Sequence, residues 1–145
     1  MQRQWIVVAD SATARIFSTT EAISHAVQVE TLHNDKARMR KSELTSDKPG
    51  AGHGPGVGFS LQEADPKEHA AEEFARSISK SLNSGRVKGA FEDLVLVAPA
   101  HFLGMINHSL DKHTARVVSR THPVDLAHES KVPLLQHITR LNAAP

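Results

Sequence analysis

The chain has 145 residues, a formal net charge of +1 and no cysteine. With 39% hydrophobic and 23% charged residues, its composition is that of a folded globular protein and excludes a disordered one. The lack of cysteine excludes disulfides and thiolate chemistry, and the small net charge excludes a uniformly basic nucleic-acid-binding protein, so any basic patch must be local. The length predicts one domain over residues 1–145.

Three short strands are predicted in the first 33 residues. WIVVAD is a β-branched apolar run, and SATARIFS and HAVQVETLH alternate apolar with polar residues. Asp10 and Ser11 provide turn chemistry between the first two strands, and we expect the Asp10 side chain to bond the backbone of Ser11 and Ala12. The pattern therefore predicts an antiparallel meander.

Helices and strands alternate in the second half of the chain. Asp65 is a predicted N-cap, Pro66 suits the first helical position, and Glu68 completes a capping-box pattern before a helix that runs to Leu82. FEDLVLVAP has the continuous apolar character of a buried central strand. The remaining predicted elements are that strand at 91–99, a helix at 100–110, a strand at 114–122 and a helix from Pro133 to 141.

The resulting order, β-β-β-α-β-α-β-α, predicts an α/β fold. Right-handed crossovers that join the last strands to the meander give a mixed five-stranded sheet with helices packed on it. This is the element order of a ribonuclease H-like domain, with a long glycine-rich loop before the first helix. Order alone carries no function.

Residues 34–64 show no sustained period, and a loop of about 30 residues far exceeds the usual length in a compact domain. Its first part, DKARMRKSELTSDK, has five Lys or Arg against three Asp or Glu, and the following KPGAGHGPGVGF has glycine at alternate positions from 50 to 58. The basic part is suited to backbone phosphates. The candidate partner-binding residues are Lys36, Arg38, Arg40, Lys41, Lys48, Gly50, Gly52, His53, Gly54, Gly56, Gly58 and Gln62.

The glycines do not form a known phosphate-binding motif. A dinucleotide fingerprint needs G-x-G-x-x-G and a Walker loop needs Gly-Lys followed by Ser or Thr, and the stretch contains neither. Alternating glycine gives a flexible chain that Pro49 and Pro55 stiffen locally. Two interpretations remain: a flexible spacer without chemistry, and a loop that contacts a partner.

Four stretches together resemble the bacterial family of host attachment proteins: WIVVADSATARIF, SDKPGAGH, EHAAEEFARSISKSL and FEDLVLVAPAHFLGMINHSL. That family is similar to the central domain of archaeal and eukaryotic class-one peptide-release factors, which has the same element order and a glycine-rich loop at the same place. The release-factor loop carries Gly-Gly-Gln, but this loop reads GAGHGPGVGFSLQ, with Gln62 four residues past Gly58. Peptidyl-tRNA hydrolysis is therefore not expected.

Asp10 is the one residue that suggests catalysis, because nucleases with a ribonuclease H-like fold hold metal with an aspartate on the first strand. Two-metal catalysis needs several converging carboxylates. Glu72 or Glu73 is a possible second ligand, but the strand at 91–99 ends in Val-Ala-Pro where such enzymes carry an acid. We therefore expect Asp10 and Ser11 to be structural turn residues.

The histidines do not predict a metal site. His101 and His108 are seven residues apart on one predicted helix, which separates them by about 10 Å, too far to chelate one ion. We expect no metal, no cofactor and no catalytic residue.

The sequence and the resemblance lead to one expected function and two alternatives. We expect a non-catalytic cytoplasmic binding module that contacts RNA or the ribosome through the basic, glycine-rich loop. The cytoplasmic location follows from an N-terminal apolar run of five residues, too short for a signal peptide, and from the lack of a membrane-spanning apolar stretch. The alternatives are a surface-associated factor in attachment to host cells, which the family name implies, and a metal-dependent nuclease.

Overall fold

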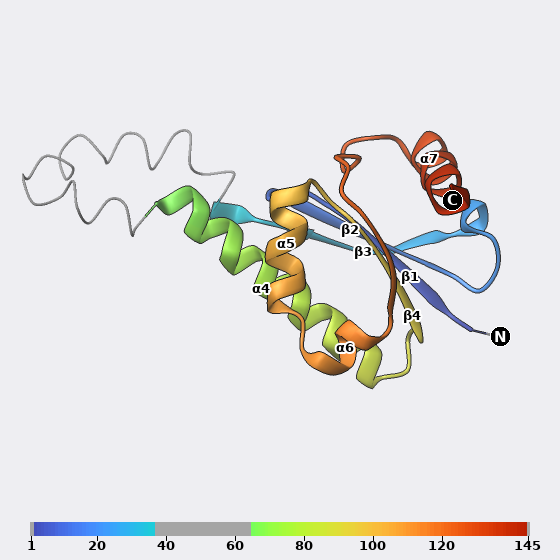
Figure 1. Ribbon diagram of the computed structural model, residues 1–145, viewed down its shortest axis with the longest axis horizontal. Coiled ribbons are helices and arrows are strands. Elements are labelled where there is room, and N and C mark those ends of the chain that lie inside the picture. Colours follow the sequence, from blue (N-terminus) through green and yellow to red (C-terminus); the bar gives the residue numbers. More distant parts are fainter. Residues whose placement is uncertain (1, 37–64, 145) are drawn as a thin grey trace, which may run out of the picture.

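The computed structural model describes residues 2–36 and 65–144. Five strands form one sheet in the order β3-β2-β1-β4-β5 (Figure 1). The β1–β2 and β2–β3 pairs are antiparallel, whereas β1–β4 and β4–β5 are parallel. The strands are β1 (Gln4–Ala9), β2 (Thr13–Thr19), β3 (Val27–His33), β4 (Asp93–Val97) and β5 (Val118–His122).

The central strands β1 and β4 are buried on both faces. Ile6 to Ala9 and Leu94 to Val97 have no exposed surface, as their continuous apolar sequences predict for strands covered on both sides. Because the two strands are parallel, with Val8 opposite Val97, their carboxyl ends meet at one edge of the sheet. We call this edge the carboxyl edge.

Helices cover both faces of the sheet. Helix α4 (Pro66–Val87), α5 (Ala100–Ser109) and the short α6 (Lys112–Arg116) lie on one face, and α7 (Lys131–Ala143) lies on the other. Residues at helical spacing on α4, including Phe74, Ile78 and Leu82, are buried against the first face. A 3₁₀ turn, η1 (Ile23–His25), connects β2 to β3. The predicted mixed sheet with helices packed on it is confirmed.

The start of α4 shows the expected cap. The Asp65 carboxylate accepts hydrogen bonds from the backbone N–H groups of Lys67 at 3.0 Å and Glu68 at 3.3 Å, and Pro66 is the first helical residue. The Glu68 side chain, however, meets the His101 ring on α5 at 3.0 Å. It links two helices, a role that the predicted capping box did not give it.

Several predicted boundaries were wrong. Helix α4 continues to Val87, five residues past the predicted end at Leu82. The fifth strand begins at Val118, because Thr114 and its neighbours form α6, whose N-cap Asp111 accepts a hydrogen bond from the Thr114 backbone N–H. The last helix begins at Lys131, two residues before Pro133, since Pro133 is tolerated within the first turn.

Most of the predicted loop at 34–64 lies outside the described residues, and only Asn34 to Lys36 are seen. Within residues 2–36 and 65–144, no helix combines the length and the apolar character that crossing a membrane requires.

Gly85 permits a close approach of α4 to the sheet. A Cβ at this position would lie 2.6 Å from Cη2 of Trp5, whose ring stacks on Phe91 with centroids 4.7 Å apart. We expect Gly85→Ala to lower the free energy of unfolding by about 1–3 kcal/mol through overpacking, despite the higher helix propensity of alanine. Urea unfolding of the variant measures this change.

Gly104→Ala in α5 is the matched control, because nothing beyond its own helix backbone lies within 4 Å of where a Cβ would stand. We expect this variant to be as stable as the native protein or more stable by up to about 1 kcal/mol. Equal effects of the two substitutions would contradict the role given to the Gly85–Trp5 contact.

Candidate functional site

The β1–β2 turn at the carboxyl edge is organised by Asp10. One carboxylate oxygen, Oδ1, accepts hydrogen bonds from the backbone N–H groups of Ala12 and Thr13, both at 2.9 Å. The Asp10 backbone N–H donates to the Thr13 carbonyl at 2.9 Å. The predicted bonds of the Asp10 side chain go to the backbone of Ser11 and Ala12. The observed bonds go to Ala12 and Thr13.

The other carboxylate oxygen of Asp10 meets a histidine from the far end of the chain. Oδ2 lies 2.9 Å from Nε2 of His128, which precedes α7. Arg15 on β2 donates to the carbonyls on both sides of this histidine, at 3.2 Å to Ala127 and 2.6 Å to Glu129. Partial burial lowers the pKa of the Arg15 guanidinium, which still remains charged at neutral pH. The β5–α7 connection is thus fastened to the first two strands.

Asn34 fastens the opposite side of the same turn. Its backbone N–H donates to the Ala12 carbonyl at 2.9 Å, and its side-chain amide donates to the carbonyls of Ser11 at 2.9 Å and Ala70 at 3.2 Å. Asn34 is only 7% exposed, and its hydrogen bond to Ala70 is buried, whereas its bond to Ser11 is partly buried. One side chain therefore joins the end of β3, the β1–β2 turn and the second turn of α4.

Charged pairs link neighbouring elements at this edge. Lys36 Nζ lies 2.5 Å from the Glu73 carboxylate on α4, and the other Glu73 oxygen lies 3.2 Å from His69. The hydrogen bond from Lys36 lowers the pKa of the Glu73 carboxyl, and the positive charges of Lys36, His69 and Arg76 act in the same direction. Lys36, predicted to contact a partner, is here paired within the protein.

The carboxyl edge presents no carboxylate cluster in the described part of the chain. Asp10 is bonded to turn amides and to His128, Glu73 is bonded to Lys36, and β4 is followed by Ala98 and Pro99. No three His, Asp or Glu residues within 2–36 and 65–144 are placed to hold a metal ion. Two closely spaced divalent ions need several converging carboxylates to offset their repulsion.

An open groove of about 470 Å³ runs between α4 and α5. His101 and His108 line it from α5, and Glu68, Glu72 and Arg76 line it from α4. His101 on α5 pairs with Glu68 on α4. The groove thus has both acidic and basic side chains and no surface of a single charge.

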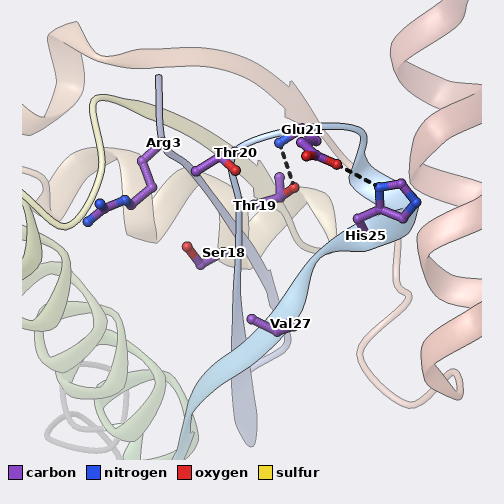
Figure 2. Close-up of a pocket in the computed structure, with 7 residues that line it drawn as sticks. All are labelled: Arg3, Ser18, Thr19, Thr20, Glu21, His25 and Val27. Carbon is purple, nitrogen blue, oxygen red and sulfur yellow. Dashed lines mark hydrogen bonds and ion pairs between the residues drawn. The ribbon is translucent and has the colours of Figure 1, made fainter. Parts of the chain in front are cut away.

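A second hollow, of about 310 Å³, lies on the sheet near the start of β1 (Figure 2). Arg3, Ser18, Thr20 and Val27 are among the residues that line it. Its one carboxylate, Glu21, is bonded to the His25 ring at 3.1 Å. The hollow is shallow and mixed in charge, and it adds no reactive group.

Most of the predicted partner-binding residues lie outside the described residues. Lys36 is the exception and is held by Glu73. The others are Arg38, Arg40, Lys41, Lys48, Gly50, Gly52, His53, Gly54, Gly56, Gly58 and Gln62.

Sequence reasoning missed Asn34, Arg15 and His128. In the sequence, Asn34 has no feature that distinguishes it from other loop residues. Its position directly after β3 is the one signal that it could hold the end of that strand. Arg15 and His128 are separated by more than a hundred residues in the sequence, and no local pattern reports a contact at that separation.

The family model "Protein required for attachment to host cells" matches residues 5–138. The chain therefore belongs to this family, and the resemblance seen in the sequence is confirmed. No curated protein matches the chain.

Two solved structures are similar to the chain. The crystal structure of the archaeal translation termination factor aRF1 aligns with a TM-score of 0.50 and 10% identity, over 97% of this chain and 39% of that one. A structure titled "Archaeal protein" aligns with a TM-score of 0.48 and 13% identity, over 97% of this chain and 38% of that one. The chain thus spans well under half the length of either structure, and the likeness to aRF1 is one of fold.

Substitutions of Asp10 separate its turn role from its pairing with His128. We expect Asp10→Ala to lower the free energy of unfolding by about 1–2 kcal/mol, because two turn amides lose their acceptor. Asp10→Asn should cost less than about 1 kcal/mol, since an amide oxygen still accepts from Ala12 and Thr13. Urea unfolding of both variants checks the order.

His128→Ala is the control for the second oxygen of Asp10. His128 is 75% exposed, and exposed pairs contribute about 0–1 kcal/mol, so this variant should resemble Asp10→Asn. If Asp10→Asn were as damaging as Asp10→Ala, the turn amides would not be what the carboxylate stabilises.

Proposed function

We propose that this protein is a non-catalytic cytoplasmic binding module that contacts RNA, free or in the ribosome, through residues 37–64. The observation that carries the proposal is that the polar groups of the carboxyl edge are used in bonds within the protein. These groups bond one another and fasten three parts of the chain together. The two described residues that flank residues 37–64 are both joined to α4: Lys36 pairs with Glu73, and Asp65 caps the helix.

The bonding of Asp10 supports a non-catalytic role. A metal-binding or proton-transferring carboxylate needs free lone pairs directed toward a substrate. Asp10 is 18% exposed, and both of its oxygens have partners within the protein. No second acid follows β4, where Ala98 and Pro99 stand.

The charge of the segment supports an anionic partner. Residues 37–48 have four Lys or Arg against two Asp or Glu. The pairing of Lys36 with Glu73 removes one cation from the predicted set and leaves Arg38, Arg40, Lys41 and Lys48. Lys and Arg side chains bind phosphates without sequence specificity.

The family gives a second candidate function. Its description names attachment to host cells, so a surface-associated role is the alternative that we propose to test beside the first. The two differ in where the protein resides.

Co-sedimentation with ribosomes tests the first proposal. We expect the native protein to sediment with them at low salt, and we expect replacement of Arg38, Arg40 and Lys41 by Gln to reduce the bound fraction about tenfold, because each lost phosphate contact weakens binding. Equal sedimentation of the two proteins would contradict contact through the segment.

Two further assays separate the alternatives. Native protein incubated with RNA and magnesium or manganese should give no cleavage, and cleavage that disappears in Asp10→Asn would restore the nuclease. Protease treatment of intact cells should leave the protein undigested, whereas its loss under these conditions would favour the surface role.

A further inference from the structure

Charge is distributed very unevenly along α4 and the elements beside it. From Asp65 to Glu73 the chain has four acidic residues and one lysine. Residues 74–91 have four Lys or Arg and no acid, and residues 104–118 add Lys112 and Arg116 against one acid, Asp111. These two stretches together carry an excess of five positive charges in a chain whose net charge is +1.

The cations of α4 lie on its solvent-facing side. Arg76, Lys80, Ser84 and Lys88 follow one another at intervals of four residues, and all are exposed. Residues at this interval lie above one another on a helix. The row from Arg76 to Lys88 extends about 18 Å, which corresponds to about five base steps of a nucleic-acid duplex.

Helix α6 continues this surface. Thr114 is fully buried, and its hydroxyl accepts a hydrogen bond from Arg86 Nε at 3.1 Å, which holds α6 against the last turns of α4. Lys112 and Arg116 lie two residues before and after Thr114, on the opposite side of a helix, and are exposed. We call Arg76, Lys80, Lys88, Lys112 and Arg116 the basic face.

The members of the basic face do not form ion pairs with the described part of the protein. Arg86, by contrast, lies 3.9 Å from Asp111 and bonds Asn83, so it is used internally and is not counted in this surface. The dipole of α4 favours cations only within its last turn. It therefore accounts for Lys88, but Arg76 and Lys80 lie one to three turns earlier.

We propose that the basic face binds the phosphate backbone of RNA. Exposed Ser84 stands between Lys80 and Lys88, and hydroxyl donors beside Lys and Arg are typical of phosphate contacts. A surface that enters anionic membranes carries large apolar side chains beside its cations, and Val87 is the one such residue exposed in the described part of α4. No exposed Phe, Trp or Tyr lies on the described α4 or α6 beside the five cations, so we expect contact with the phosphate backbone rather than stacking on bases.

The basic face consists of residues outside 37–64, and its proposed contact does not depend on the function proposed for that segment. Lys80, Lys112 and Arg116 can be replaced by Gln in the full chain, since none of the three is paired with a carboxylate in the described structure and all are exposed. A control variant removes the same charge elsewhere, at the exposed Lys67, Lys131 and Arg140. The third variant is the one with Arg38, Arg40 and Lys41 replaced.

Fluorescence anisotropy with a labelled RNA duplex, measured over a range of salt concentrations, compares these proteins. We expect the basic-face variant to bind about tenfold more weakly than the native protein, and the slope of log K against log salt to become shallower by about two to three. The control variant should change affinity less than about threefold.

Several results would overturn the proposal. Equal losses in the basic-face and control variants would show an effect of net charge alone, and a lack of binding by native protein would remove the RNA contact altogether. Binding to phosphatidylserine vesicles without binding to the duplex would assign the surface to lipid. Loss of binding only in the variant at Arg38, Arg40 and Lys41 would support RNA contact through residues 37–64 and contradict RNA contact through the basic face. The two proposals therefore fail separately.

Discussion

The amide of Asn34 is the contact on which the carboxyl edge depends. It donates to one carbonyl in the β1–β2 turn and to one in α4, while its backbone N–H bonds a second turn carbonyl. Each of these hydrogen bonds contributes about 0.5–1.5 kcal/mol, so the side chain stabilises the groups that it joins. Asp10 completes the arrangement by accepting the turn amides on the other side. The turn is thereby fixed to the sheet, to α4 and, through His128, to the β5–α7 connection.

The regular elements followed from the sequence because their signals are local. The apolar run of β4 and the Asp65–Pro66 start of α4 each reflect the preferences of neighbouring residues. The start of β5 did not follow, because TARVVSRTH reads as a strand throughout, while packing of Thr114 against Arg86 and its bond to Asp111 hold the first three residues in α6. Side-chain contacts at the candidate site join distant segments, and these were not predictable from spacing.

The sequence and the fold together place this protein's polar groups in two different kinds of surface. At the carboxyl edge, the acids and amides are bonded to one another and stabilise the fold. On the outer side of α4 and α6, the cations face solvent without partners in the described structure. Polar groups that are already bonded within the protein have little left to offer a substrate, whereas exposed unpaired cations attract anions. This contrast is why we propose binding rather than catalysis for this member of the host attachment family.

The central claim is that Asn34 fastens the β1–β2 turn to α4 and that the carboxyl edge depends on this contact. Hydrogen–deuterium exchange of Asn34→Ala tests it most directly. The matched control is Asn142→Ala, which removes from α7 the side-chain oxygen that bonds the His122 ring of β5. Our account predicts faster exchange in Asn34→Ala at the amides of Ala12 and Thr13 and in the first turns of α4, with β4 unchanged. Exchange that accelerates equally across the whole sheet, or that does not change at the turn, would contradict it.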